Sequence, residues 1–498
     1  MKTIRIELIV VAVLCAGCSA ADDDSLNVGS AGENLAVSLT EARSVDGAYI
    51  SWREHIIDDE ATGGVALRGS DGLVMADLDQ DGFIDVVSVH ESDDVYDGAP
   101  EGHIRIAFGS ADPDQWQLVT LAEGPEAGAA EDVAIGDING DGYLDIVAAC
   151  ELAHLIYFEN PGNKIRDDRW RRVIPPATLN RGSFIRVFLA DLNDDGKLEV
   201  VTPNKGAQNP EQAAQEQKQI SFFEITGDPL DGETWVEHEL TRVPWPINSQ
   251  PVDLDGDGDL DVVGGSVALR KIFWFENQSR NGEFAFVEHS LDLVAAAPGR
   301  NAAGEEGGEA LVSSGFNMEF VDLSGDGRLD ILTFDTPPLL GRRLIWLEQP
   351  ADFAMAWPYH FIDSNAPDSF VGISVSDING DGNLDIMTGG YSLSSRSSDD
   401  EITPQGSLGR LAWFENTAPD AVNWIRHDFS RRQRGMFDKF VARDMDGDGD
   451  VDFVSTRGNS GPYDGVFWLE QVRTGEPVRS FQRAREQDSP EVPLPAAL

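Results

Sequence analysis

One aspartate-rich pattern of nine residues occurs seven times in this 498-residue chain and contains its clearest candidates for chemistry. The pattern is D-x-[DNS]-x-D-G-x-x-[DE], and its first copy runs from Asp77 to Asp85. Side-chain oxygens at positions 1, 3, 5 and 9, with the backbone carbonyl of position 7, are the hard ligands that Ca²⁺ prefers. So many carboxylates in one short loop repel one another unless a cation lies between them. The pattern therefore predicts up to seven calcium sites.

The predicted ligands are the side chains at positions 1, 3, 5 and 9 of each copy. In chain order they are Asp77, Asp79, Asp81, Asp85, Asp137, Asn139, Asp141, Asp145, Asp191, Asn193, Asp195, Glu199, Asp253, Asp255, Asp257, Asp261, Asp322, Ser324, Asp326, Asp330, Asp377, Asn379, Asp381, Asp385, Asp444, Asp446, Asp448 and Asp452. Position 6 is glycine in every copy, which permits a tight turn. An EF-hand begins alike, but it requires an acidic position 12 and flanking helices, and position 12 of the first copy is Ser88.

The segments that must position these loops have the pattern of strands. Each loop lies between two short apolar runs, such as 184–189 before the third loop and 86–89 after the first. Aromatic segments recur farther out, such as 274–277 (WFEN) and 424–427 (WIRH). Short β-branched or aromatic runs bounded by Gly and Asp are typical of strands. Each unit then reads as strand A, loop, strand B, strand C and strand D, which predicts an all-β, seven-bladed β-propeller of four-stranded antiparallel blades.

The order of the segments also predicts how the ring closes. The array opens with a strand D at 52–57 and ends with a strand C at 468–471. The last blade therefore lacks its outer strand unless the N-terminal strand supplies it. We expect this pairing, because it leaves no unpaired sheet edge.

These loops and their Trp-Phe-Glu-Asn strands resemble the FG-GAP/VCBS repeat family, which includes the calcium-bearing propeller of integrin α-subunits and many exported bacterial proteins. The resemblance covers residues 50–471, although the Phe-Gly/Gly-Ala-Pro signature itself is largely absent. It implies a propeller with its metal loops on one face. It implies no single activity, because similar repeats occur in lectins, in adhesion proteins and in sugar-acting lyases and dehydratases.

The N-terminus has the pattern of an export signal. Lys2 and Arg5 precede an apolar stretch at 8–14 that is too short to span a bilayer as a helix. The following Cys15-Ala16-Gly17-Cys18 resembles a bacterial lipoprotein signal. We therefore expect a signal peptide at 1–18, lipidation at Cys18 and anchoring to the bacterial cell envelope. The alternative is cleavage after Ala20 and free secretion. Residues 19–49 then form a flexible acidic tether, 50–471 the propeller and 472–498 a disordered tail.

The net charge limits the possible partners. Asp and Glu number 88 against 37 Lys and Arg, which gives a formal charge of −51. This charge argues against nucleic acid or an anionic membrane surface as partner. We therefore expect a monomer that meets the membrane only through its lipid anchor and binds a glycan or a protein at the cell surface.

The loops opposite the metal loops are the expected ligand site. Candidate residues there are Trp245, which could stack on a sugar, the pair Arg342 and Arg343, and two histidines outside the repeat pattern, His90 and His154. The basic residues of these loops favour an anionic ligand. Two functions remain open: a non-catalytic, calcium-stabilised binding module, or a carbohydrate lyase or dehydratase at the mouth of the central channel. Clustering of His90 or His154 with Arg and Tyr at one mouth would favour the enzyme.

Overall fold

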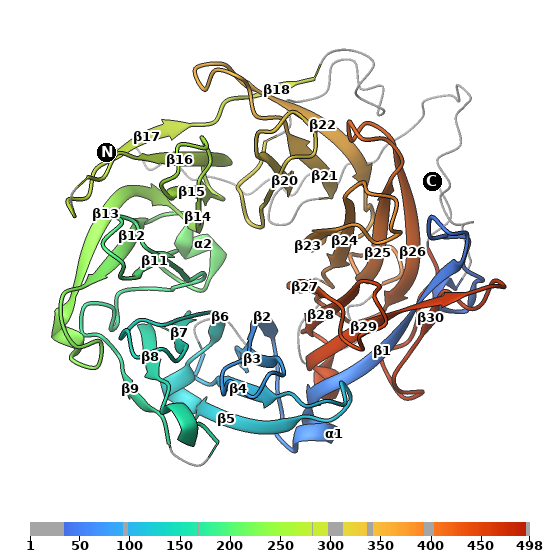
Figure 1. Ribbon diagram of the computed structural model, residues 1–498, viewed down its shortest axis with the longest axis horizontal. Coiled ribbons are helices and arrows are strands. Elements are labelled where there is room, and N and C mark those ends of the chain that lie inside the picture. The colour runs from blue at the N-terminus through green and yellow to red at the C-terminus, as the bar shows by residue number, and fades with distance from the viewer. Residues whose placement is uncertain are drawn as a thin grey trace, which may run out of the picture.

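A computed structural model shows seven sheets arranged as blades around a central axis, each built on four antiparallel strands, as predicted (Figure 1). The structure describes residues 34–92, 98–152, 154–166, 169–280, 282–296, 312–335, 342–392 and 403–494. The predicted lipidation site, Cys18, lies outside the described residues. Within them, no helix is long and apolar enough to cross a membrane.

Four strands form the basic unit of every blade, and they run outward from the axis in the order A, B, C and D. Blade 1 contains β2 (Ser70–Ala76), β3 (Asp85–His90), β4 (His103–Phe108) and β5 (Gln117–Glu123). Blade 2 contains β6 (Ala130–Gly136), β7 (Asp145–Cys150), β8 (His154–Glu159) and β9 (Arg171–Val173). Blade 3 contains β10 (Phe188–Ala190), β11 (Glu199–Pro203), β12 (Gln217–Ile225) and β13 (Trp235–Pro244). Blade 4 contains β14 (Pro246–Val252), β15 (Asp261–Ser266), β16 (Lys271–Asn277) and β17 (Phe286–Ser290).

Two of the remaining blades have a fifth strand. Blade 5 contains β19 (Glu319–Val321), β20 (Asp330–Phe334), β21 (Arg343–Leu347) and β22 (Trp357–Ser364), with β18 (Leu293–Ala295) parallel to β22 outside it. Blade 6 contains β23 (Phe370–Ser376), β24 (Asp385–Gly390), β25 (Gly409–Asn416) and β26 (Trp424–Arg432). Blade 7 contains β27 (Phe440–Arg443), β28 (Asp452–Arg457), β29 (Gly465–Thr474), β1 (Tyr49–Asp59) and β30 (Phe481–Gln482).

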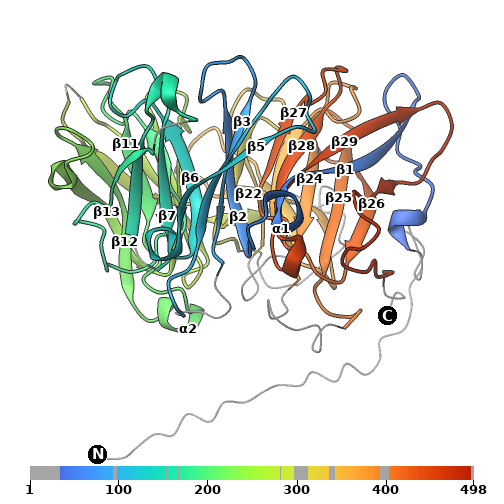
Figure 2. The same cartoon turned by 90° about the horizontal axis from the view of Figure 1, so that it is seen from below.

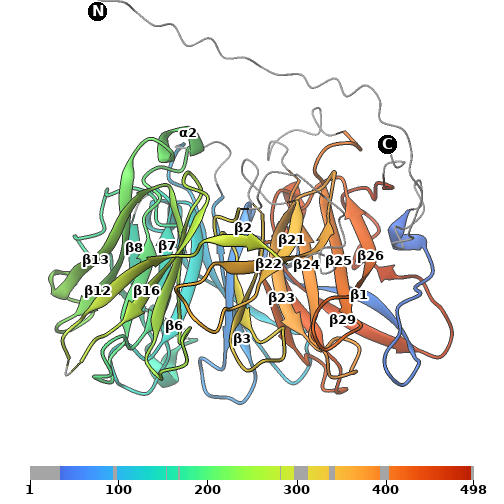
Figure 3. The ribbon, with the colours of Figure 1, turned by 90° about the horizontal axis from the view of Figure 1, so that it is seen from above.

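The helices are short and lie in the connections. They are η1 (Leu35–Val37), α1 (Glu60–Gly63), η2 (Gly124–Ala127), η3 (Gly162–Lys164), α2 (Pro210–Ala213), η4 (Gly232–Thr234) and η5 (Gly461–Tyr463). The blades stand as upright sheets when the ring is seen from either side, with α2 at one face (Figures 2 and 3).

The N-terminal strand closes the ring, which confirms that prediction. β1 pairs antiparallel with β29, from Tyr49 opposite Thr474 to Asp59 opposite Gly465. β1 is therefore strand D of blade 7, and the first and last parts of the repeat array form one sheet. Among the described residues, every blade therefore has its four strands A to D.

Both predicted flexible flanks are shorter than expected. Residues 475–494, predicted as disordered tail, fold back over blade 7, where β30 pairs parallel with β1 and Phe481 is 2 % exposed. Residues 34–48, predicted as tether, pack on the same blade and bury Leu35 and Ala36. The tail prediction is wrong up to residue 494 and the tether prediction from residue 34. Isolated apolar side chains, separated by polar residues, pack both segments against blade 7. Because these side chains do not recur at a regular spacing, the sequence shows no periodic pattern that would predict an ordered segment.

A histidine of strand D and an aromatic ring of strand C stack in five blades. Ring centroids lie 4.0–4.9 Å apart, and each histidine Nε2 is within 2.7–2.9 Å of a strand C glutamate. The groups are Phe222/His238/Glu224, Trp274/His289/Glu276, Trp346/His360/Glu348, Trp413/His427/Glu415 and Trp468/His55/Glu470. These contacts give the recurring aromatic-x-Glu and histidine positions a structural role, since they fasten the outer strand to its neighbour.

Candidate metal loops and the channel-mouth cavity

All seven aspartate loops join strand A to strand B and so lie on one face of the ring. In blade 1 the loop 77–85 runs from the end of β2 at Ala76 to the first residue of β3, Asp85. The B–C and D–A connections, including α2 after β11, lie on the other face (Figure 2). The structure therefore separates the candidate metal sites from the candidate ligand loops, as the repeat order predicts.

Backbone N–H groups hold every loop in one conformation. The position 1 carboxylate accepts from the N–H of position 6 in all seven copies, and the position 5 carboxylate accepts from that of position 7. The glycine at position 6 has φ between +83° and +101°, the left-handed region that glycine adopts without strain. The loop backbone thus turns the side chains at positions 1, 3 and 5 toward a common centre.

Position 9 anchors the loop to its blade. The Asp85 carboxylate is fully buried and accepts from the N–H of Leu78 in the loop and from that of Gly109 after strand C. Burial is the main cause that raises the pKa of this carboxyl to about 6. The equivalent Asp385 has its pKa raised to about 8 for the same main reason. These carboxylates are costly to keep ionised in the fold, and a cation beside them would offset that cost.

The seven copies differ in how many charges they bring together. Three carboxylates place oxygens within 4.8 Å of one another in the first, fourth and seventh loops. The fourth and seventh loops also have a carboxylate at position 7, Asp259 and Asp450. In the first loop Nη2 of Arg166 lies 2.5 Å from Oδ2 of Asp79 and 3.0 Å from Oδ2 of Asp81. A guanidinium thus already neutralises part of that loop, so the fourth and seventh loops are the strongest candidates for a divalent ion.

The donor set fits calcium. The ligands are carboxylate, amide and hydroxyl oxygens with an added backbone carbonyl, and no thiolate or imidazole belongs to any loop. Such all-oxygen sets with flexible geometry suit Ca²⁺ better than transition metals.

Asparagine or glutamine at the end of strand C links neighbouring loops. Asn277 of blade 4 donates to the carbonyl of Leu260 in its own loop and to that of Leu192 in the loop of blade 3. Equivalent pairs of bonds start from Asn160, Gln349 and Gln471. The sequence showed this position as a recurring residue, but its bond to the preceding blade is a tertiary contact that no local pattern reveals.

The central channel opens at the face opposite the loops into a cavity of about 140 Å³. Residues from all seven blades line it, and they lie near the start of strand A or the end of strand B. They are Asp71, Glu91, Glu131, Glu151, Ile185, Lys205, Gln208, Pro210, Trp245, Ile247, Val267, Phe316, Val371, Tyr391, Met436 and Asp438. Because every blade contributes, this cavity is the point where the ring can hold one ligand with several blades at once.

Trp245 is the predicted ligand residue that the structure places in this cavity. It lies in the turn between β13 and β14 with φ +49°, and its ring packs against Ile185, Ile247 and Val267. Its indole Nε1 is buried and has no hydrogen-bond partner among the described residues. The ring therefore forms part of an apolar wall of the cavity.

The other predicted ligand residues lie away from the cavity. His90 is fully buried, with its two ring nitrogens 2.6 Å from Ser70 Oγ and 3.0 Å from Ser88 Oγ. His154 is buried and its Nε2 lies 2.9 Å from the carbonyl of Glu126. Burial lowers the pKa of both histidines, so both imidazoles are neutral and structural.

The predicted arginine pair divides into one exposed and one paired side chain. Arg342 is exposed, whereas Nε of Arg343 lies 2.5 Å from Oδ2 of the buried Asp335. Other arginines of this face are buried in ion pairs, among them Arg410 with Asp428 and Arg431 with Asp368. The basic residues predicted for this face do not gather at the cavity, whose described lining contains five carboxylates and one lysine.

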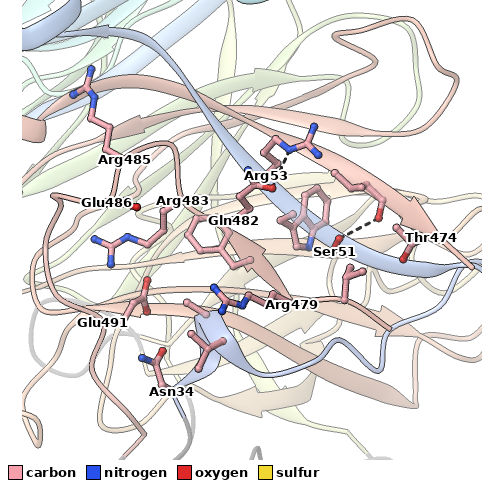
Figure 4. A pocket seen from close by; sticks show the side chains of 16 residues that line it. Asn34, Ser51, Arg53, Thr474, Arg479, Gln482, Arg483, Arg485, Glu486 and Glu491 are labelled. Carbon is pink, nitrogen blue, oxygen red and sulfur yellow. Dashed lines mark hydrogen bonds between the residues drawn. The ribbon is translucent and has the colours of Figure 1, made fainter. Parts of the chain in front are cut away.

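A larger groove, of about 810 Å³, lies on blade 7 between the N-terminal segment from Asn34 and the C-terminal segment up to Glu491. Figure 4 shows Asn34, Ser51, Gln482 and Glu491 around it, from the N-terminal segment, β1 and the C-terminal segment. Ser51 Oγ donates to the carbonyl of Val472, and Arg53 Nε donates to Gln482 Oε1. The described lining of this groove comes from blade 7 and the two segments that pack on it, so we assign the groove to ring closure.

Comparison with known families agrees with this geometry. A family model described as an FG-GAP-like repeat matches residues 77–148 and 253–333. Each matched segment begins at the first aspartate of one loop and extends past the last ligand of the next. No curated protein matches the chain.

Proposed function

Because this chain is a seven-bladed β-propeller of FG-GAP-like repeats, we propose that it is a calcium-stabilised binding module that works outside the cytoplasm. Its ligand site is the channel-mouth cavity. The observation that carries this proposal is the convergence of residues from all seven blades on one cavity, on the face away from the aspartate loops.

Calcium would be held by the side chains at positions 1, 3, 5 and 9 of the loops. When bound, the ion supplies positive charge that neutralises the carboxylates and joins strands A and B of a blade. The chain itself orients the ligands, because the N–H groups of positions 6 and 7 fix the carboxylates of positions 1 and 5 in every copy.

The ligand is a glycan or a protein at the cell surface, and the protein reaches it from a lipid anchor at Cys18. The signal-like segment before Cys18 supports this placement. The acidic surface of the chain keeps nucleic acids and anionic lipids away.

The alternative, a carbohydrate lyase or dehydratase, requires a base that can reach a sugar at the channel mouth. His90 and His154 do not meet this requirement, because both are buried and hydrogen-bonded outside the cavity. The two histidines predicted as catalytic bases therefore give the enzyme no support, and its base would have to come from other residues of the lining.

A glycan array and a panel of surface proteins, probed with the purified protein in calcium, would test the proposal. We expect binding without a change in ligand mass, and a loss of binding in Trp245→Ala. The matched control is Trp116→Ala, which removes an indole directly before β5 that does not belong to the cavity lining. A change in ligand mass would support the enzyme, and ligand binding that Trp245→Ala leaves intact would place the site elsewhere.

A further inference from the structure

Three buried carboxylates converge on one point of the channel-mouth cavity. Asp71 and Glu91 of blade 1 and Glu131 of blade 2 each place an oxygen within 4.8 Å of the other two. They come from the start of β2, the residue after β3 and the start of β6. None of them belongs to an aspartate loop, and the repeat pattern does not predict their meeting.

Glu131 forms no direct contact with a basic group among the described residues, although the charges of Arg186 and Lys205 act on it from a distance. Its side chain lines the cavity and the residue is 8 % exposed, yet the described residues offer its carboxylate neither a hydrogen bond nor an ion pair. Burial raises the pKa of Glu131 well above its ordinary value, and the neighbouring Glu91 and Glu151 raise it further. A buried, unpaired carboxylate directed into a cavity indicates that a positive ligand group completes the site.

The basic groups nearby already have partners. Lys205, the only basic residue in the described lining, forms an ion pair with Glu151. Nη2 of Arg186 lies 3.3 Å from Oδ2 of Asp438, and the same nitrogen donates a hydrogen bond to Oδ1 of Asn317. In the described lining, acidic residues thus outnumber basic ones: Asp71, Glu91, Glu131, Glu151 and Asp438 lie there with one lysine.

The opposite wall of the cavity is apolar. Ile185, Trp245, Ile247 and Val267 form one cluster there, and Phe316 packs against it. A bare metal ion would use the carboxylates and leave this wall without a role. A sugar ring would bring hydroxyl groups to a wall that offers them few hydrogen-bond partners.

We propose that the channel mouth receives a primary alkylammonium group, the end of a lysine side chain presented by a protein partner. The ammonium donates its three N–H bonds to Asp71, Glu91 and Glu131, and the methylene stem packs against the apolar wall. An ammonium is a compact charge with three donors, which suits three acceptors around one point, whereas a planar guanidinium suits a fork. This inference rests on the proposed location of the ligand site and names its ligand class.

Calorimetric titration of the calcium-saturated protein with four small probes tests the inference. The probes are Nα-acetyl-lysine methylamide, its uncharged counterpart Nα-acetyl-norleucine methylamide, Nα-acetyl-arginine methylamide and glucosamine. We expect the lysine probe to bind roughly tenfold or more tightly than the others, since one good charged contact is worth that factor. Equal binding of the norleucine probe would overturn the inference, and this comparison needs no variant.

A charge-removing variant locates the site. Glu131→Gln keeps the side-chain shape and should weaken the lysine probe by roughly tenfold, while Glu101→Gln, an exposed acid in the B–C connection of blade 1, should leave it unchanged. Asp71→Asn gives the same readout if Glu131→Gln folds poorly. Lysine binding that Glu131→Gln and Asp71→Asn leave unchanged would overturn the inference, and so would Mn²⁺ that displaces the lysine probe, because the carboxylates would then form a metal site.

The two proposals fail separately. A cell-surface ligand that Trp245→Ala abolishes, together with no binding of the lysine probe, would refute the ammonium inference and leave the binding site at the channel mouth. Ligand binding that neither Trp245→Ala nor Glu131→Gln affects would refute the location itself.

Discussion

Asn277 and Leu192 connect two blades through one hydrogen bond: Nδ2 of Asn277 lies 2.8 Å from the carbonyl oxygen of Leu192. The same amide donates at 2.9 Å to Leu260 in its own loop. One buried side chain thus ties the aspartate loop of blade 3 to that of blade 4. Because this hydrogen bond connects the two loops, we expect that disorder in one loop also destabilises the neighbouring loop.

The first prediction follows from this link. Asn277→Ala leaves two buried carbonyls without a donor and should lower the free energy of unfolding by about 1–3 kcal/mol. Gln278→Ala, at the exposed neighbouring position, is the control and should change it by less than about 0.5 kcal/mol. Urea unfolding followed by tryptophan fluorescence measures both, and equal midpoints would show that the link carries no stability.

The second prediction concerns calcium. An ion that binds only the folded state at a hundredfold excess over its Kd stabilises by about 2.7 kcal/mol per site. EGTA should therefore lower the melting temperature. Asp257→Asn in the fourth loop should reduce the calcium-dependent part more than Asp81→Asn in the first, where Arg166 already neutralises charge. Metal analysis by mass spectrometry provides the count of ions, and a melting temperature unchanged after all ions are removed would contradict calcium stabilisation.

The third prediction concerns pH. Burial and the carboxylates of Glu91 and Glu151 raise the pKa of Glu131 above its ordinary 4.5, while Arg186 and Lys205 oppose the shift. As pH rises from about 4.5, the unfolded state releases this proton before the folded state does, so stability falls. Glu131→Gln should flatten this fall between pH 5 and pH 8, at constant saturating calcium, relative to Glu101→Gln. Parallel pH profiles of the two variants would show that Glu131 does not carry the effect.

The fourth prediction concerns ring closure. Removing residues 1–33 takes away nothing that the structure describes and should leave the melting temperature unchanged. Removing residues 1–60 deletes β1, the strand that pairs with β29, and should destabilise the fold or prevent it. Differential scanning calorimetry of both shortened chains separates the two cases, and similar melting curves would mean that β29 pairs with another strand.

The fifth prediction concerns the C-terminal segment. The Asp488 side chain is 3 % exposed and lies between Arg457 and Arg432, whose charges hold the pKa of its carboxyl well below the usual range despite its burial. Asp488→Asn leaves buried guanidinium groups unpaired and should cost about 3–5 kcal/mol of unfolding free energy. Glu486→Gln, exposed two residues earlier, should be neutral. A neutral Asp488→Asn would show that the segment adds nothing to the fold.

The repeated features of this fold are predictable from its sequence, because a pattern that is ambiguous in one copy is supported by the same pattern in six others. The loops, the order of the strands, the position 6 turn and the role of β1 all follow from the register of one pattern. The turn at position 4 is less evident, since Gln80 and Asp194 adopt the left-handed φ that glycine has in the other copies.

The features that occur once were predicted poorly. Asp71, Glu91 and Glu131 meet only because blades 1 and 2 are adjacent, and no spacing along the chain indicates that their oxygens converge. His90 was a candidate because it departs from the repeat, yet two serine hydroxyls hold it in the core. Departure from a repeat identifies a residue as unusual, but whether it faces a cavity depends on the packing of the strands around it.

The shared last blade has a topological consequence. Asn34 and Glu491, near the two ends of the described chain, line the same groove on blade 7. A short linker could therefore join the chain near these two positions, and new termini could be opened in an exposed connection such as residues 226–228 between β12 and β13, without changing any strand pairing. In such a circular permutant, the blade that combines strands from the first and last parts of the chain would be blade 3 instead of blade 7. The order in which the blades are synthesised would change, while the finished ring would remain the same.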